Sequence, residues 1–221
     1  LIKLSIMEFK KNFLSLRMAV LLPILFLFFV GSSWGFSDNN ANLPAEVSAD
    51  TPFEVLFLSS LFILFSATLG IVLIGFDGIS KKRISGLLSI EFCQPISKTM
   101  LGLSQLLGLW FTIIIPTIIF SFISIILIFK QMNEWPSFFE FSLFVFATSL
   151  LLFWYASIQL LVSCLAKDMG SAVTLGVGTW LLFTMIWLLI TAVLATIFGV
   201  DVTNTTNETF MSFSSKVDMF S

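Results

Sequence analysis

Five long apolar stretches divide this sequence, and they constrain its fold more than any other feature. The stretches cover about residues 18–36, 53–76, 101–129, 138–163 and 171–199. Each is long enough for a helix to cross the hydrocarbon core of a bilayer, which takes roughly 20 apolar residues. Because a backbone in lipid must satisfy its own hydrogen bonds, we expect an all-α, polytopic transmembrane helical bundle with five visible spans.

The composition excludes a water-soluble monomer. Hydrophobic residues make up 57% of the 221 residues and charged residues only 11%. Soluble domains carry about 25% charged residues. A chain with so few charges cannot cover its own surface with polar groups, so the lipid membrane is its expected environment.

The positions of the basic residues predict the orientation, since short loops rich in Lys and Arg stay in the cytoplasm. With a cytoplasmic N-terminus, nine basic residues face inward and only Lys130 and Lys216 face outward. The nine are Lys3, Lys10, Lys11, Arg17, Lys81, Lys82, Arg83, Lys98 and Lys167. We therefore expect a cytoplasmic N-terminus and a cytoplasmic loop at 77–100, in a multi-pass protein of the cell membrane.

The two ends of the chain lead to separate expectations. In residues 1–13 the apolar side chains recur at helical spacing, with basic residues elsewhere: Ile2, Ile6, Phe9 and Phe13. This pattern predicts an interfacial helix, and the alternative is a basic tail that only sets the topology. An odd number of spans leaves residues 200–221 outside the cell. We expect this extracytoplasmic segment to precede a sixth span in a longer chain.

The spans lack the groups that intramembrane chemistry needs. Only Glu54 and Glu140 place a charge within the span limits, each among the first three residues of its span. Ion-coupled transporters keep ionisable groups deep in the membrane, and a buried enzyme site needs paired carboxylates, a serine–histidine pair or a metal cluster. The chain has no histidine, and Cys93 and Cys164 make no convincing metal site. We expect no catalytic, cofactor-binding or metal-binding residues in this chain.

The loop at 77–100 has more pattern than a connector needs. Three cations stand together in it: Lys81, Lys82 and Arg83. Apolar residues recur around them: Ile79, Ile84, Leu87, Leu88, Ile90 and Phe92. Such an amphipathic segment is expected to bind lipid headgroups or another protein, and a solvated connector is the alternative. Gly86 lies in an apolar run and predicts either a turn or a close backbone approach.

The same loop resembles a motif of the membrane-spanning permease subunits of ABC transporters, in the type-2 exporter subfamily. These proteins carry a stretch like D-x-I-S-x-E-R-x-x-G-T-L after span two, followed by P-[IV]-S-[RK] before span three. The matching residues here are Asp77, Ile79, Ser80, Arg83, Gly86, Leu88, Pro95, Ile96, Ser97 and Lys98. The sequence departs from this pattern at three positions. Lys82 stands where the family tends to have Glu, Leu87 where it has Thr, and Gln105 where a Lys often opens span three. The reversed charge at Lys82 puts any salt bridge of the family at that position in doubt.

The resemblance implies that 1–221 forms one transmembrane permease domain with 77–100 as its coupling loop. In this family two permeases, identical or related, pair in the membrane, and each engages a separate cytoplasmic ATPase. The residues expected to contact the ATPase are Asp77, Ile79, Ser80, Lys81, Lys82, Arg83, Gly86, Leu88, Pro95, Ser97 and Lys98. The chain has no G-x-x-x-x-G-K-[ST] phosphate loop, so ATP and Mg²⁺ are expected on the ATPase.

The expected function is therefore ATP-driven export as a transporter subunit, with no enzyme activity in this chain and no nucleic acid as partner. Two other functions stay open. A non-transporting membrane anchor or assembly scaffold would recruit a cytosolic partner through the basic loop. A facilitated channel would need a polar stripe along its pore, and the spans show none. The sequence does not identify a transported substrate.

Overall fold

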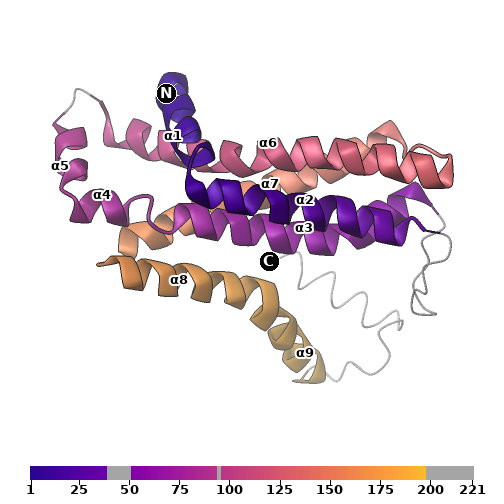
Figure 1. Cartoon of the computed structure of the whole chain (residues 1–221). Coiled ribbons are helices and arrows are strands. Elements are labelled where there is room, and N and C mark those ends of the chain that lie inside the picture. The colour runs from indigo at the N-terminus through magenta and orange to yellow at the C-terminus, as the bar shows by residue number, and fades with distance from the viewer. Residues whose placement is uncertain (39–50, 94–95, 198–221) are drawn as a thin grey trace. The chain divides into compact units, whose positions relative to one another are not determined.

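The computed structural model describes residues 1–38, 51–93 and 96–197, and these ranges are helical without β-strands. The helices are α1 (Ile2–Phe13), α2 (Leu16–Phe36), α3 (Pro52–Gly75), α4 (Ser80–Ile84), α5 (Leu87–Phe92), α6 (Lys98–Met132), α7 (Phe138–Leu165), α8 (Met169–Leu181) and α9 (Trp187–Ile197) (Figure 1). A π-helical segment, Leu182–Ile186, joins α8 to α9. The prediction of an all-α fold is confirmed.

The chain divides into two compact units, residues 1–176 and the residues from 177 on. The first unit contains α1 to α7 and the start of α8, and the second contains the end of α8, the π-helical segment and α9. A single permease domain over 1–221 stays a prediction. The segment at 200–221 lies outside the described residues.

Five helical stretches among the described residues are long and apolar enough to cross a membrane, and each overlaps one predicted span. The third span, formed by α6, begins at Lys98 rather than near 101, because the Ser97 hydroxyl accepts a hydrogen bond from the backbone N–H of Met100 at 3.3 Å. Hydropathy does not detect such an N-cap. Nor does it detect the π-helical segment inside the predicted span 171–199.

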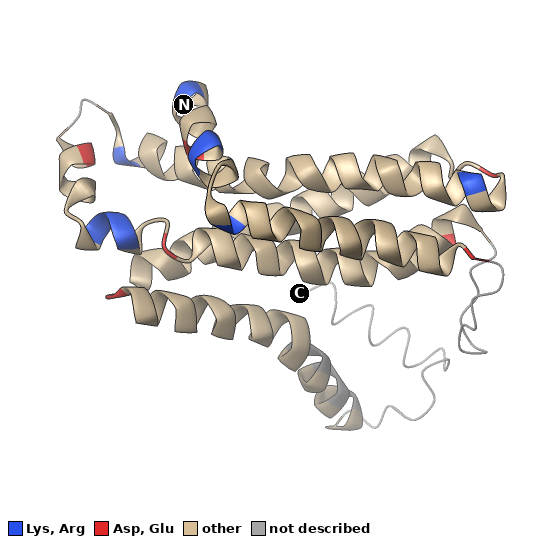
Figure 2. Ribbon diagram, in the orientation of Figure 1, with Lys and Arg blue, Asp and Glu red and all other residues tan. Residues whose placement is uncertain are grey.

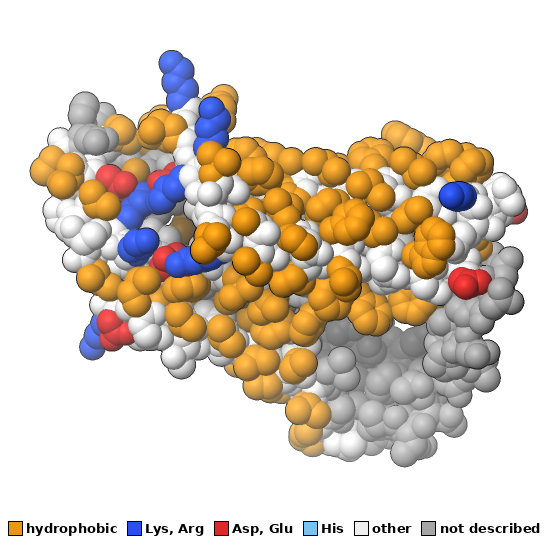
Figure 3. All heavy atoms as spheres, viewed as in Figure 1, with side chains coloured by type: hydrophobic (Ala, Val, Ile, Leu, Met, Phe, Trp, Pro, Cys, Tyr) orange, Lys and Arg blue, Asp and Glu red, His pale blue; other side chains and the backbone are white. Residues whose placement is uncertain are grey.

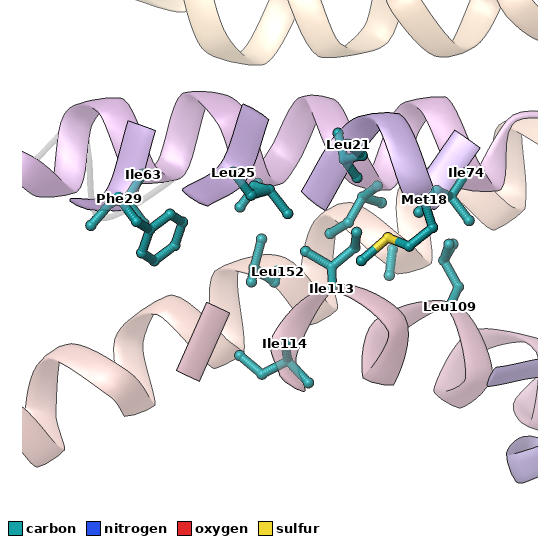
Figure 4. Close-up of a cluster of buried hydrophobic side chains, with 13 residues drawn as sticks. Met18, Leu21, Leu25, Phe29, Ile63, Ile74, Leu109, Ile113, Ile114 and Leu152 are labelled. Carbon is teal, nitrogen blue, oxygen red and sulfur yellow. The ribbon is translucent and has the colours of Figure 1, made fainter. Parts of the chain in front are cut away.

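The core of the first unit lies between α2, α3, α6 and α7. One face of α2 supplies Met18, Leu21, Leu25 and Phe29, which recur at helical spacing and are buried. They meet Ile63 of α3, Ile113 of α6 and Leu152 of α7 (Figure 4). Apolar side chains also cover much of the outer surface seen in Figure 3, as lipid contact requires.

Glycines decide where helices of the first unit approach closely. A Cβ at Gly70 would lie 2.8 Å from the Leu21 side chain, so α2 crosses α3 there. A Cβ at Gly108 would lie 2.6 Å from the Cβ of Glu8, so α1 rests directly on α6. Gly31 and Gly35, which lie four residues apart on α2, face open space. Close helix contact therefore occurs at Gly70 and Gly108 but not at Gly31 and Gly35.

Candidate functional site

Most charged residues of the first unit lie at one end of it (Figure 2). This α1 end is formed by α1, the first turn of α2, the residues after α3, α4, α5, the start of α6 and the end of α7. It carries basic residues that the sequence placed on one side of the membrane. Which side this end faces stays a prediction.

Lys82 joins three helices at the α1 end. Its ammonium lies 2.7 Å from Glu8 Oε1 on α1 and 2.8 Å from Glu91 Oε1 on α5, and only 7% of its side chain is exposed. The other oxygen of Glu8 pairs with Lys11 at 3.3 Å. Lys82, where the family tends to have Glu, is therefore paired within this chain, because two carboxylates lie beside its ammonium.

The pKa of Glu8 reports the balance at this contact. Burial alone raises the pKa of the carboxyl, because a charge loses its hydration there. The hydrogen bond and charge of Lys82, followed by those of Lys11, outweigh burial and bring the pKa below its ordinary value of 4.5. Glu8 is therefore a carboxylate at neutral pH and holds α1 to α4 by charge.

A second ion pair ties α2 to the residues after α3. The Arg17 guanidinium donates to both oxygens of Asp77, at 2.7 and 2.8 Å. It also lies 4.6 Å from the centre of the Phe76 ring. A bidentate pair fixes orientation as well as distance, so the entry to the loop is held at a defined angle to α2.

Arg83 attaches the loop to the end of α7. Its guanidinium donates to the carbonyl of Cys164 at 2.6 Å and to that of Ala166 at 3.0 Å. The last carbonyls of a helix have no partner within the helix, so Arg83 serves as their cap. The Arg83 guanidinium thus forms hydrogen bonds within the protein, although the residue as a whole is exposed.

Ser163 makes a further contact between α7 and the start of the loop. Its hydroxyl accepts hydrogen bonds from the backbone N–H groups of Ile79 at 3.0 Å and Ser80 at 3.2 Å. Both residues are buried, with Ser80 1% exposed. These two motif residues therefore position the chain rather than present side chains to a partner.

The outer part of the loop is a helical hairpin, the α4–α5 hairpin (residues 80–92). Gly86 connects its helices with φ at +74°, a left-handed conformation that favours glycine. No atom lies within 4 Å of a Cβ built at Gly86. Of the two predictions for this glycine, the structure therefore shows the turn and not the close approach.

The outer surface of the hairpin is apolar with one unpaired cation. Ile84, Leu87 and Ile90 are 56%, 51% and 61% exposed. Lys81 is exposed, and its ammonium forms no ion pair with the residues that the structure describes. The three adjacent cations thus separate: Lys82 and Arg83 hold the hairpin, and Lys81 is available to a partner.

The remaining predicted residues lie between the hairpin and α6. Leu88 is half-buried, Ser97 caps α6, and the Lys98 ammonium lies 5.3 Å from the centre of the Phe92 ring. Pro95 lies outside the described residues. Sequence reasoning did not identify Glu8, Arg17, Glu91 or Ser163 as partners of the loop; Arg17 was used only as one of the basic residues that predict the orientation. The one available signal was Glu8, an isolated acid among the basic residues of 1–13.

An apolar helical bundle with five possible spans and one ion-paired end defines a multi-pass membrane protein. A family model described as ABC-2 family transporter protein matches residues 3–217, and the chain belongs to this family. It is thus a membrane permease component of an ABC transporter and not itself a catalytic subunit. The predicted family is confirmed. A comparison with curated proteins finds no match.

Proposed function

We propose that this permease couples to a separate ATPase through the α4–α5 hairpin, and that ATP hydrolysis there drives export of a substrate. One observation carries the proposal: the hairpin exposes apolar side chains and the Lys81 ammonium, while its inner side is tied to the bundle. An exposed apolar surface marks a contact with a protein or a membrane, and a free cation beside it can pair with an acidic group of a partner. Membership of a transporter family indicates an ATPase as the partner.

The ties suit a coupling element because they connect the hairpin to several helices. Asp77 leads to α2, Lys82 to α1, and Arg83 to α7. A movement of the hairpin would therefore displace three helices together, whereas a loosely tethered loop would absorb it. Coupling between distant sites needs a contiguous set of rigid elements of this kind.

The remaining parts of the proposal follow the family. The ATPase is cytoplasmic, so the α1 end faces the cytoplasm, in agreement with the nine-to-two distribution of basic residues. ATP and Mg²⁺ bind the ATPase. A second permease, identical or related, completes the translocation path in the cell membrane. The chemistry of the substrate stays open.

The test is co-purification with the ATPase, together with the ATPase rate of the assembled complex. Lys81→Glu should weaken both at least several-fold, because a reversed charge turns attraction into repulsion at a docking surface. Leu87→Asp should do the same by placing a carboxylate in the apolar contact. Lys3→Glu is the matched control, since Lys3 is exposed on α1 and outside the hairpin. Unchanged binding and rate in Lys81→Glu and Leu87→Asp would refute the docking role.

Gly86 offers a second variant that leaves the outer side chains in place. Gly86→Ala must adopt a left-handed conformation, at a cost of about 1–2 kcal/mol, and should reorient α5. Gly86→Asn should be tolerated better, because Asn adopts this conformation more readily. Loss of coupling in the alanine variant with recovery in the asparagine variant would support the turn. Equal coupling in both would contradict it.

A membrane scaffold predicts the same loss of ATPase binding, so a separate measurement is needed to exclude it. Vesicles that contain the permease and its ATPase should lose or accumulate substrate only with ATP. Full ATPase binding without ATP-dependent transport of any co-purifying cargo would favour the scaffold.

A further inference from the structure

A cavity of about 650 Å³ lies at the α1 end, beneath the α4–α5 hairpin. It is lined by α1, the first residues of α2, the end of α3 and the residues after it, the hairpin, α6 and one residue of α7. Figure 3 shows basic and acidic side chains gathered beside α1 at this end. Small-molecule sites in proteins measure roughly 300–1,000 Å³, so the cavity is large enough for a ligand.

Most charges in the cavity wall already have partners. Arg17 is paired with Asp77 through both carboxylate oxygens, and Lys82 holds one oxygen of Glu8 and one of Glu91. These pairs stabilise the wall, but they leave few groups for a ligand. Only a few polar groups of the wall are therefore free to bind a ligand.

Two buried acceptors in the wall have no hydrogen-bond partner among the described residues: Glu91 Oε2 and Gln105 Oε1. Gln105 is 7% exposed. A buried acceptor without a donor is unfavourable, more so for a charged group. Both atoms therefore need N–H or O–H donors from outside the described residues, such as those of a bound ligand.

At the edge of the cavity stands Lys81, which is also exposed on the hairpin surface and has no ion-pair partner in the described chain. Its ammonium can bind an anion such as a phosphate. Apolar residues line the same cavity, among them Leu109 and Leu160. A matching ligand thus combines N–H donors, an anionic group and an apolar portion.

We propose that the cavity binds the headgroup of a phospholipid with a primary amine, of the phosphatidylethanolamine type. Its ammonium donates to Glu91 and Gln105, its phosphate pairs with Lys81, and its chains follow the apolar lining toward the bilayer. The position suits a lipid, because charged residues at the end of a transmembrane bundle lie at headgroup level.

Other abundant headgroups satisfy the wall less well. Choline has no N–H group, so Glu91 and Gln105 would stay without donors. A glycerol headgroup offers hydroxyl donors, but it brings a phosphate without a cation to a wall that contains Glu8, Asp77 and Glu91. The order of affinity is therefore ethanolamine, then glycerol, then choline. The lipid site does not depend on the proposed coupling, because its binding is measured on the permease alone.

The test uses the amine itself as the variable. The purified permease is placed in nanodiscs that contain equal amounts of phosphatidylethanolamine, its N-methyl and N,N-dimethyl derivatives and phosphatidylcholine. Lipids retained after transfer to detergent are counted by native mass spectrometry. Retention should fall with each methyl group, to about tenfold less choline than ethanolamine lipid, because hydrogen bonds to charged groups are lost. Equal retention across the series, or phosphatidylglycerol retained above phosphatidylethanolamine in a paired experiment, would overturn the proposal.

A pair of glutamine variants locates the site. Gln105→Met keeps the side-chain length, removes one acceptor and breaks no ion pair, so ethanolamine lipid retention should fall several-fold. Gln159→Met is the matched control, because Gln159 is 2% exposed, also has an unpartnered amide atom, and does not line the cavity. Equal loss in both variants would overturn the assignment. If Gln105→Met does not fold, the methylation series on the unchanged protein still decides.

A competition experiment distinguishes a membrane lipid from a soluble ligand with the same headgroup. Glycerophosphoethanolamine carries the same headgroup without acyl chains. We expect it to compete only at concentrations far above those of the lipid, since it lacks the apolar contacts. Tight binding of glycerophosphoethanolamine without retention of phosphatidylethanolamine would overturn the membrane source.

Discussion

The two ends of the first unit use charge in different ways. At the α1 end, Lys82 pairs with Glu8 across 74 residues, and Arg17 pairs with Asp77 across 60. At the opposite end, carboxylates act within one turn of their own helix. Glu54 accepts from the backbone N–H of Thr51 at 3.1 Å, and Glu140 accepts from that of Ser137 at 2.9 Å.

This difference indicates how each end responds to the loss of one contact. A cap satisfies backbone groups of one helix, so its loss frays that helix alone. An ion pair between distant segments holds two elements together, and its loss frees both. The α1 end is therefore held together by ion pairs between segments, whereas at the opposite end the carboxylates cap single helices and the helix ends are joined by apolar packing and by a hydrogen bond between Ser37 and Gln131. The predictions below test this contrast, beginning with the largest expected effect.

Removing Lys82 should cause the largest loss. Lys82→Met leaves the carboxylates of Glu8 and Glu91 close together without their cation, and breaking such a pair should cost about 3 kcal/mol of unfolding free energy. Lys10→Met is the control, since Lys10 is exposed and has no ion pair within the described chain. Reversible unfolding in mixed micelles measures both. A loss of unfolding free energy below about 1 kcal/mol for Lys82→Met would contradict this prediction, because exposed surface ion pairs contribute no more than that.

The contact between α1 and α6 should be the next most sensitive. Gly108→Ala places a Cβ 2.6 Å from the Glu8 Cβ and 3.2 Å from backbone atoms of α1, so the helices must separate. Overpacking of this kind costs about 1–3 kcal/mol. Gly102→Ala on the same helix meets no atom within 4 Å and should be neutral or stabilise by up to about 1 kcal/mol. Thermal unfolding in detergent compares the two, and an equal change in both would contradict the close contact.

Removing a cap at the opposite end should have a smaller and local effect. Glu140→Ala should cost about 1 kcal/mol or less, in keeping with a carboxylate at a helix N-terminus. Hydrogen–deuterium exchange should accelerate in the first turn of α7 and stay unchanged in α1 and α4. Faster exchange at the α1 end in this variant would show that the two ends are not independent.

Acidification should give the smallest effect and should act on the α1 end. The pKa of Glu8 is lowered in the folded protein, so its contribution to stability is present above the ordinary value of 4.5 and is lost as pH falls through the lowered pKa. The protection factors of α1, which compare each exchange rate with the intrinsic rate at the same pH, should therefore fall below about pH 4.5. Glu8→Gln should remove much of this dependence. An unchanged pH profile in Glu8→Gln would assign it to other carboxylates.

Local features of the fold were predictable because their signals are local. Apolar length predicted the five spans, since a helix in lipid needs little information beyond hydropathy. Gly86 predicted a turn, because left-handed backbone strongly favours glycine. The gathering of basic residues at one end followed from their position between spans. The ends of α6 were missed by a few residues, since one hydroxyl group at Ser97 sets its start.

The roles of Lys81, Lys82 and Arg83 were not predictable, although the three cations are consecutive. Successive residues of a helix point about 100° apart, because a turn takes 3.6 residues. Lys82 therefore enters the protein while Lys81 stays exposed. Its partners Glu8 and Glu91 could be identified only once α1 and α5 were placed beside α4. The sequence alone determined the membrane helices and the charged end. Only the tertiary structure decided which charges are internal ties and which are free for a partner, because pairing depends on distances between segments that the order of residues does not specify.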